Sequence, residues 1–355
     1  MTIFDLFTPE LIAAYWTEAA SNRIPYLGEG LFPNAKKVGL DLSWIHGNEG
    51  LPVSLMPSAF DAKATFRDRP GIEKTETEMP FFREGFKLKE KDRQELLKLQ
   101  EVSNPYVSAV VRHYLDDARR LLEGAAVVRE RMRMALLFPT GVTPKPGFSF
   151  NANGVSYVYD YDPNSSWATN HYIALTSTAK WDAPSTADPF ANIQTMQDQV
   201  RAETGEEVRT MIMNSVTFNL LMKCDNIKNR FLTTNGLTVA YLTKAEVARV
   251  IQDVTGMRIA IYDKQYKNES GTVAKYVPDN YVAFVPDGAL GNTWFGTTPE
   301  EADLLTGAHD VSIVDTGVAL LRTVHEHPVG LDIFASQIVM PSYERMAAVG
   351  LMKVA

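Results

Sequence analysis

Apolar and polar residues follow two different periods along this chain, and each period predicts a different kind of element. Val38, Leu40, Leu42 and Trp44 alternate with polar or small residues, which predicts a half-buried strand. From residue 105 to residue 137, apolar residues instead recur every three or four positions, which predicts a long amphipathic helix that ends at Phe138-Pro139. At about 1.5 Å per residue this helix would span roughly 50 Å, so we expect other parts of the chain to be arranged along it. Its polar face is expected to carry Arg112, Asp116, Arg119, Arg120, Glu123, Glu130 and Arg133.

Shorter signals predict the remaining elements. Thr8-Pro9 begins a helix that runs to Ala20, and Asp188-Pro189 begins another that ends near Gly205. Thr243 and Glu246 form a capping box for a helix that ends before Gly256. We also expect a helix over 206–222, a hairpin turning at 151–154, and strands at 257–267, 272–277, 281–288, 329–342 and 345–355. Because helices and strands do not alternate regularly, the fold class is α+β.

The stretch from Glu73 to Glu78 is polar on both faces of an extended chain, and Pro80-Phe81-Phe82 follows it abruptly. A strand of this kind has no apolar face to place against a core of its own subunit. Prolines at 52, 57, 70 and 80 interrupt the surrounding region, which is far longer than an ordinary connection. A two-stranded hairpin in this region would be marginal alone in water, so we expect it to need a partner.

Composition and charge restrict the classes of function. The chain has 355 residues with a formal net charge of -8, which argues against tight binding to nucleic acid. It has one cysteine, Cys224, so no disulfide can form within the chain, as expected in a reducing compartment. The N-terminus lacks the features of a signal peptide, and no run of about 18 apolar residues predicts a membrane span. We therefore expect assembly in a cytoplasm and no membrane partner.

Candidate chemistry is sparse. The sequence contains no phosphate-binding loop, HExxH, CxxC or GxSxG motif. His325 and His327 would share a face of a strand, but no third metal ligand is near in sequence, and Asp160 and Asp162 are typical of a turn before Pro163. We expect no catalytic residue, no metal site and no cofactor, with a soluble metal-dependent hydrolase as the least favoured alternative.

Two blocks carry a resemblance to a known family. The order of elements, with SNRIP at 21–25 and EMPFF at 78–82 as its most specific parts, resembles the major capsid protein E family of tailed phages over essentially the whole chain. The resemblance implies the tailed-phage capsid fold of the Hong Kong ninety-seven type. It also implies the following division: an N-arm region at 1–45, an E-loop at 46–90, a P-domain at 91–206 with its spine helix at 105–137, an A-domain at 207–325, and C-terminal strands at 326–355 that return to the P-domain.

The implied function is a bacteriophage head protein that self-assembles into pentamers and hexamers of an icosahedral shell around double-stranded DNA. The polar strand would then lie across a neighbouring subunit, with Phe81 and Phe82 anchoring the base of the loop. The residues expected at this inter-subunit interface are Arg23, Arg67, Arg69, Glu73, Lys74, Glu76, Glu78, Phe81 and Phe82. Further expected partners are a scaffolding protein, a portal and a decoration protein, and no covalent cross-link is expected at Lys63 or Lys74. A bacterial compartment shell with an enzyme cargo remains the main alternative.

Overall fold

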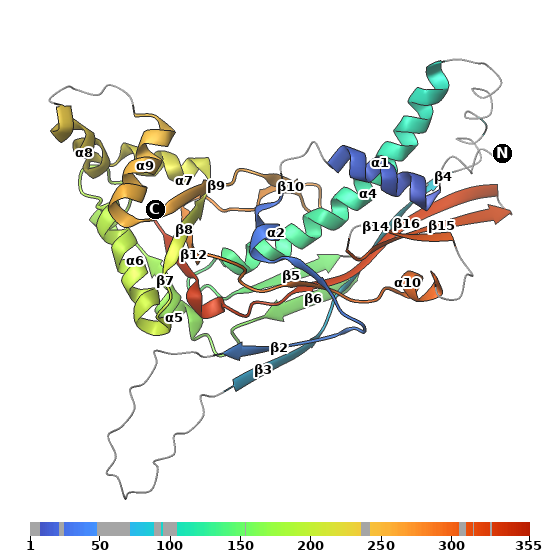
Figure 1. Ribbon diagram of the computed structural model, residues 1–355, viewed down its shortest axis with the longest axis horizontal. Coiled ribbons are helices and arrows are strands. Elements are labelled where there is room, and N and C mark those ends of the chain that lie inside the picture. Colours follow the sequence, from blue (N-terminus) through green and yellow to red (C-terminus); the bar gives the residue numbers. More distant parts are fainter. Residues whose placement is uncertain are drawn as a thin grey trace, which may run out of the picture. The chain divides into compact units, whose positions relative to one another are not determined.

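The computed structural model describes residues 8–20, 25–47, 72–88, 94, 105–152, 154–235, 242–304, 310–314, 316–326 and 329–355 (Figure 1). The chain forms two compact units. Unit 1 comprises Met1–Ser43, Glu76–Arg131 and Gly291–Ser342, and unit 2 comprises Trp44–Thr75, Met132–Leu290 and Tyr343–Ala355. This grouping differs from the five ranges expected from the sequence, which remain a prediction. No helix in these described ranges has both the length and the apolar character needed to cross a membrane.

Unit 1 is built on a mostly antiparallel sheet in the order β1-β13-β16-β15-β14, with β4 also paired to β16. Its strands are β1 (Asn34–Lys36), β4 (Phe81–Leu88), β13 (Thr293–Phe295), β14 (Asp310–Val314), β15 (Val318–Glu326) and β16 (Val329–Pro341). Its helices are α1 (Pro9–Ala20), α2 (Leu27–Leu31), α10 (Pro299–Leu304) and most of α4 (Pro105–Leu137). Buried apolar side chains of α1 and α4 share one hydrophobic cluster with β4, β14, β15 and β16.

Unit 2 contains a mixed sheet in the order β7-β17-β12-β8-β9. Its helices are α5 (Trp167–His171), α6 (Pro189–Thr204), α7 (Ser215–Lys223), α8 (Asp225–Asn235) and α9 (Lys244–Thr255), with short turns η2 (Ser177–Ala179) and η3 (Met346–Ala348). The strands of the sheet are β7 (Tyr172–Ala174), β8 (Val208–Met213), β9 (Arg258–Ile261), β12 (Tyr281–Pro286) and β17 (Gly350–Lys353). Two separate hairpins are β5 (Gly147–Ala152) with β6 (Val155–Asp160), and β10 (Gln265–Lys267) with β11 (Val273–Lys275).

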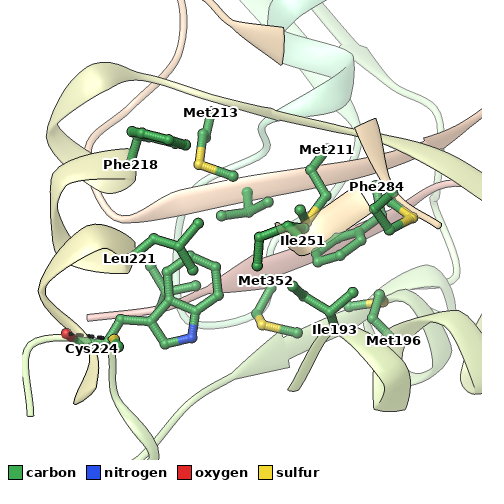
Figure 2. Packing of buried hydrophobic residues seen from close by; sticks show 14 of the residues in the cluster. Ile193, Met196, Met211, Met213, Phe218, Leu221, Cys224, Ile251, Phe284 and Met352 are labelled. Carbon is green, nitrogen blue, oxygen red and sulfur yellow. Dashed lines mark hydrogen bonds between the residues drawn. The ribbon is translucent and has the colours of Figure 1, made fainter. Parts of the chain in front are cut away.

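The core of unit 2 lies between its sheet and helices α6, α7 and α9 (Figure 2). Strand β12 is buried along its whole length, and strands β17 and β8 pair with its two edges. Ile193 and Met196 of α6 pack with Phe218 and Leu221 of α7 and with Phe284 of β12. This arrangement gives unit 2 a hydrophobic core of its own.

Several predicted elements are confirmed with their local causes. Helices α1 and α4 have the predicted bounds, and the hairpin of β5 and β6 turns where Asn-Gly predicts it. Helix α6 begins at Asp188, whose side chain accepts a hydrogen bond from the backbone of Ala191. Helix α9 has the predicted capping box and ends at Gly256 in a left-handed conformation.

Four predicted elements are wrong in part. The strand expected over 257–267 is divided into β9 and β10, and the strand expected over 345–355 is β17 preceded by the turn η3. Residues 206–222 are not one helix, because strand β8 precedes α7 and Asn214 caps the helix through the backbone of Thr217. The strand expected from Val38 begins only at Asp41 as β2 (Asp41–Gly47), and Val38 is 88% exposed. Gly39, with a φ of +96°, bends the chain between them, in a conformation that side chains disfavour.

Candidate assembly interface

The polar stretch around residue 75 forms a strand. It is β3 (Ile72–Glu78), which pairs with β2. In the ranges that the structure describes, no further strand pairs with either of them. Glu73, Lys74 and Glu76 lie within β3, and Glu78 ends it with an exposed side chain. In this hairpin, which we call the polar hairpin, β3 supplies a run of polar residues, whereas β2 also carries the buried Leu42.

Phe81 and Phe82 occupy the start of β4, directly after the polar hairpin. They pair with Ile338 and Gln337 of β16, and the pairing continues to Leu88, which is 2% exposed. Residues 79–88, the last described part of the range 46–90 that was expected to form the E-loop, therefore have a place in their own subunit, where β4 joins the unit 1 sheet. The predicted interface residues Arg23, Arg67 and Arg69 lie outside the described residues.

Charged contacts hold β4 in the sheet. Arg83 Nε lies 3.2 Å from a carboxylate oxygen of Glu300 in α10, and its guanidinium lies 4.8 Å from the ring centroid of Phe334. Glu300 is buried and also accepts a hydrogen bond of 2.7 Å from the hydroxyl of Ser336. Sequence reasoning missed these contacts, because the three elements that make them are far apart in the chain.

Residues 25–40, which contain the short helix α2 and strand β1, belong to unit 1, and we call them the N-terminal strap. Phe32 is fully buried, and its carbonyl oxygen accepts a hydrogen bond of 2.9 Å from the hydroxyl of Thr293. Strand β1 then runs parallel to β13, and Lys36 forms an ion pair with Glu301. This part of the predicted N-arm region is thus fastened within its own unit.

Helix α4 anchors the start of the strap through a buried carboxylate. Glu130 Oε1 accepts a hydrogen bond of 3.1 Å from the backbone N–H of Gly28, near the start of α2. Tyr26, the N-cap of α2, supplies no side-chain cap, so Glu130 acts as the cap from a distant helix. The expectation that Glu130 and Arg133 lie on a polar, solvated face is wrong, because they are 0% and 2% exposed. Nearly every side chain of α4 is buried from Arg129 onward.

Two of the residues considered for enzymatic chemistry, His325 and Asp162, make contacts within the fold. His325 Nε2 lies 3.1 Å from Asp332, and His327 is outside the described residues. Asp162 accepts hydrogen bonds from the backbone of Ser166 and Trp167 at the start of α5. Across the ranges that the structure describes, no group of three potential metal ligands occurs.

Cys224 is buried in the core of unit 2. Burial raises the pKa of its thiol to about 11, so the sulfur is protonated at neutral pH and is not an activated nucleophile.

Solved structures of phage and prophage proteins, two of them capsid proteins by their titles, share this fold. A putative capsid protein of a prophage of Escherichia coli CFT073 is 13% identical with a TM-score of 0.61, and the match covers 98% of this chain and 99% of that chain. A phage-related protein from Bordetella bronchiseptica RB50 is 12% identical with a TM-score of 0.58, covering 98% and 97%. A chain of the cyanophage A-1(L) capsid is 11% identical with a TM-score of 0.51, covering 93% and 92%.

A search of curated proteins by sequence found no match. The family model described as phage major capsid protein E, however, matches residues 9–349, nearly the whole chain. Because that match covers almost every element described above, the chain belongs to the phage major capsid protein E family and is a structural protein of the phage head that assembles with copies of itself into a shell.

Proposed function

We propose that the polar hairpin of β2 and β3 is the arm by which each subunit of the shell holds its neighbour. The observation that carries this proposal is the isolation of the hairpin: β2 and β3 pair only with each other in the part of the chain that the structure describes. Two strands alone are marginal in water, and β3 has almost no apolar side chains to place in a core, in contrast to β2 with its buried Leu42. A neighbouring copy would supply the missing contacts while the free subunit stays soluble.

The hairpin would act as the E-loop and contact the neighbour through Glu73, Lys74, Glu76 and Glu78, supported by Arg23, Arg67 and Arg69. Phe81 and Phe82 would complete the interface at its base. Helix α4 would be the spine of the P-domain, and the region from residue 207 would provide the A-domain at the centre of each capsomer.

The assembled product would be an icosahedral shell of pentamers and hexamers around double-stranded DNA. Each contact is weak, but every subunit repeats it, so the closed lattice is stable by summation. The net charge of -8 supports a container that confines DNA without binding its sequence or gripping its phosphates.

Assembly would take place in the host cytoplasm with a scaffolding protein, a portal and a decoration protein. Shells of uniform, correct size formed by this chain alone would contradict the need for a scaffold. We also propose that Lys63 and Lys74 form no covalent cross-link, and a ladder above the monomer band on a denaturing gel of mature particles would contradict this.

Charge reversal tests the proposed arm. Glu76→Lys changes the charge on β3, and Asp182→Lys makes the same change at an exposed residue of unit 2. A lost surface contact costs only about 1 kcal/mol, but its repetition should raise the concentration at which shells form about tenfold. Light scattering and electron microscopy measure the effect, which should depend on salt. Unchanged assembly of Glu76→Lys at low salt would contradict the proposal, and so would an equal defect in Asp182→Lys.

The contents of purified particles separate the head from a compartment shell of the same fold. Double-stranded DNA inside particles made during infection would support the proposed enclosure of DNA. A protein cargo without DNA would favour the compartment.

A further inference from the structure

Three segments of unit 1 meet at Gly296, directly after β13. A Cβ atom at this position would lie 2.8 Å from the carbonyl oxygen of Gly39, 2.8 Å from Ile338 Cγ2 and 2.9 Å from Met79 Cε. Contacts this short do not occur at real Cβ atoms, so a side chain at residue 296 would force its neighbours to move. The end of Met79 can shift at low cost, but the carbonyl of Gly39 is backbone, so its close approach depends most on the glycine.

Two of these segments are the beginning and the end of the polar hairpin. Gly39 precedes β2 and Met79 follows β3, and the backbone N–H of Met79 donates a hydrogen bond of 2.9 Å to the carbonyl oxygen of Leu40. This hydrogen bond joins the segment that enters the hairpin to the segment that leaves it, beside Gly296. Met79 is 3% exposed, so this tie is inside the packed unit.

The third segment connects this tie to the sheet. The backbone N–H of Gly296 donates a hydrogen bond of 2.9 Å to the carbonyl oxygen of Ile338 in β16. The backbone N–H of Lys37 donates one of 2.8 Å to the carbonyl oxygen of Phe295. Backbone hydrogen bonds thus hold the base of the hairpin from both the strap and the sheet. We call the contact of Gly39, Met79 and Ile338 around Gly296 the glycine junction.

We propose that the glycine junction sets the direction in which the polar hairpin leaves its subunit, and that Gly296 thereby helps to determine the curvature and diameter of the shell. This inference rests on the proposed function, in which the hairpin lies across a neighbouring copy. Gly296 is a positioning residue in this role, since it acts through the base of the hairpin and not by touching the neighbour.

The geometry gives the size of the effect. A methyl group at residue 296 would have to move the carbonyl of Gly39 by about 0.6 Å to reach an ordinary contact distance of about 3.4 Å. Strands lie about 4.8 Å apart, so a shift of one strand by this amount tilts the hairpin by roughly 7°. Over a seven-residue strand of about 23 Å, the far end would move by roughly 3 Å. Such a displacement is the length of a hydrogen bond, enough to break the register of contacts with a neighbour.

The test uses the full-length chain produced together with its head-assembly partners. Gly296→Ala is compared with the wild-type chain and with Gly124→Ala, a control in α4 where a Cβ would meet no atom within 4 Å. Gly39→Ala is the second variant. Its Cβ would also meet nothing within 4 Å, but its φ of +96° forces the same carbonyl to move by a different route. Circular dichroism and thermal unfolding establish folding, and electron microscopy measures particle diameters.

We expect folded Gly296→Ala subunits that form shells of altered or widely spread diameter or stop at capsomers, with the same change in Gly39→Ala. Gly124→Ala should match the wild-type chain. If Gly296→Ala does not fold, Gly39→Ala decides the question. Folded variants that form shells of wild-type diameter in normal yield would overturn the inference while leaving the proposed function intact. Failure of the wild-type chain and of Gly124→Ala to form closed shells would instead count against the proposed function.

Discussion

Replacing Glu130 should detach the N-terminal strap from α4 without unfolding either unit. The carboxylate is fully buried and accepts the backbone N–H of Gly28 at 3.1 Å. Glu130→Ala removes this acceptor, whereas Glu130→Gln keeps an oxygen in nearly the same place and removes only the charge. The two variants therefore separate the hydrogen bond from the helix-dipole effect.

The magnitude follows from two contributions. Leaving a buried N–H without an acceptor costs about 1–3 kcal/mol, and a negative charge at a helix N-terminus contributes about 0.5–1 kcal/mol. Because Tyr26 offers no replacement cap, Glu130→Ala should destabilise the closed strap by about 2–4 kcal/mol. Glu130→Gln should cost about 1 kcal/mol or less.

Hydrogen exchange on unassembled subunits is the suitable assay, because it reports local opening of the strap separately from global unfolding. Amides of α2 and β1 should exchange roughly 30- to 700-fold faster in Glu130→Ala, and less than about tenfold faster in Glu130→Gln. Arg120→Ala, an exposed change on the same helix, is the control. Wild-type exchange rates of the strap in a folded Glu130→Ala variant would refute the assignment of Glu130 as its anchor.

Three further predictions concern unit 2. Ile193→Ala, within the core, should lower the free energy of unfolding by about 2–5 kcal/mol in denaturant titrations, and a loss below 1 kcal/mol would contradict the packing described. Burial lowers the pKa of His171 in spite of Glu203 and Asp162, while its value in the unfolded chain is about 6.5. Its contribution to stability is thus present above about pH 6.5 and lost as the pH falls below it, so unfolding midpoints should drop with acidification less steeply in His171→Gln. With a pKa of about 11, only about a thousandth of the Cys224 side chain is thiolate at pH 8, so it should react with a thiol reagent only after denaturation. Fast labelling of the native protein would contradict this prediction.

Elements with local signals could be predicted from the sequence, and elements that depend on distant partners could not. Helices α6 and α9 were predictable because their caps lie within a few residues of their ends. Strand β8 was merged with α7 because most of its residues are buried, so period-2 alternation is missing. Strand β8 ends at Met213, and the next residue, Asn214, is the N-cap of α7. In the sequence Asn214 cannot be recognised as a cap unless the strand before it has been identified.

The same limit applies to the assembly interface. The polar character of β3 was visible in the sequence, and so was the abrupt change to aromatics after it. The place of β4 in the sheet was not, because its partner β16 lies about 250 residues further along the chain. Glu130 shows the limit most clearly, because spacing alone puts it with the polar residues of α4, whereas in the structure it is buried and accepts a hydrogen bond from the distant Gly28.

A shell subunit must be soluble when free and must present its arm in one direction when it meets a copy of itself. A hairpin with apolar faces would meet the second requirement at the cost of the first, because exposed apolar strands aggregate. In this chain the two requirements are divided between residues: β3 is polar along its length, and the direction of the hairpin is held at its buried base by Met79, Gly39 and Gly296. Buried residues at the base of the hairpin, which do not contact the neighbouring subunit, would thus determine the orientation in which two subunits bind each other. Substitutions at the glycine junction should therefore alter shell geometry more than substitutions of equal size along the exposed strand.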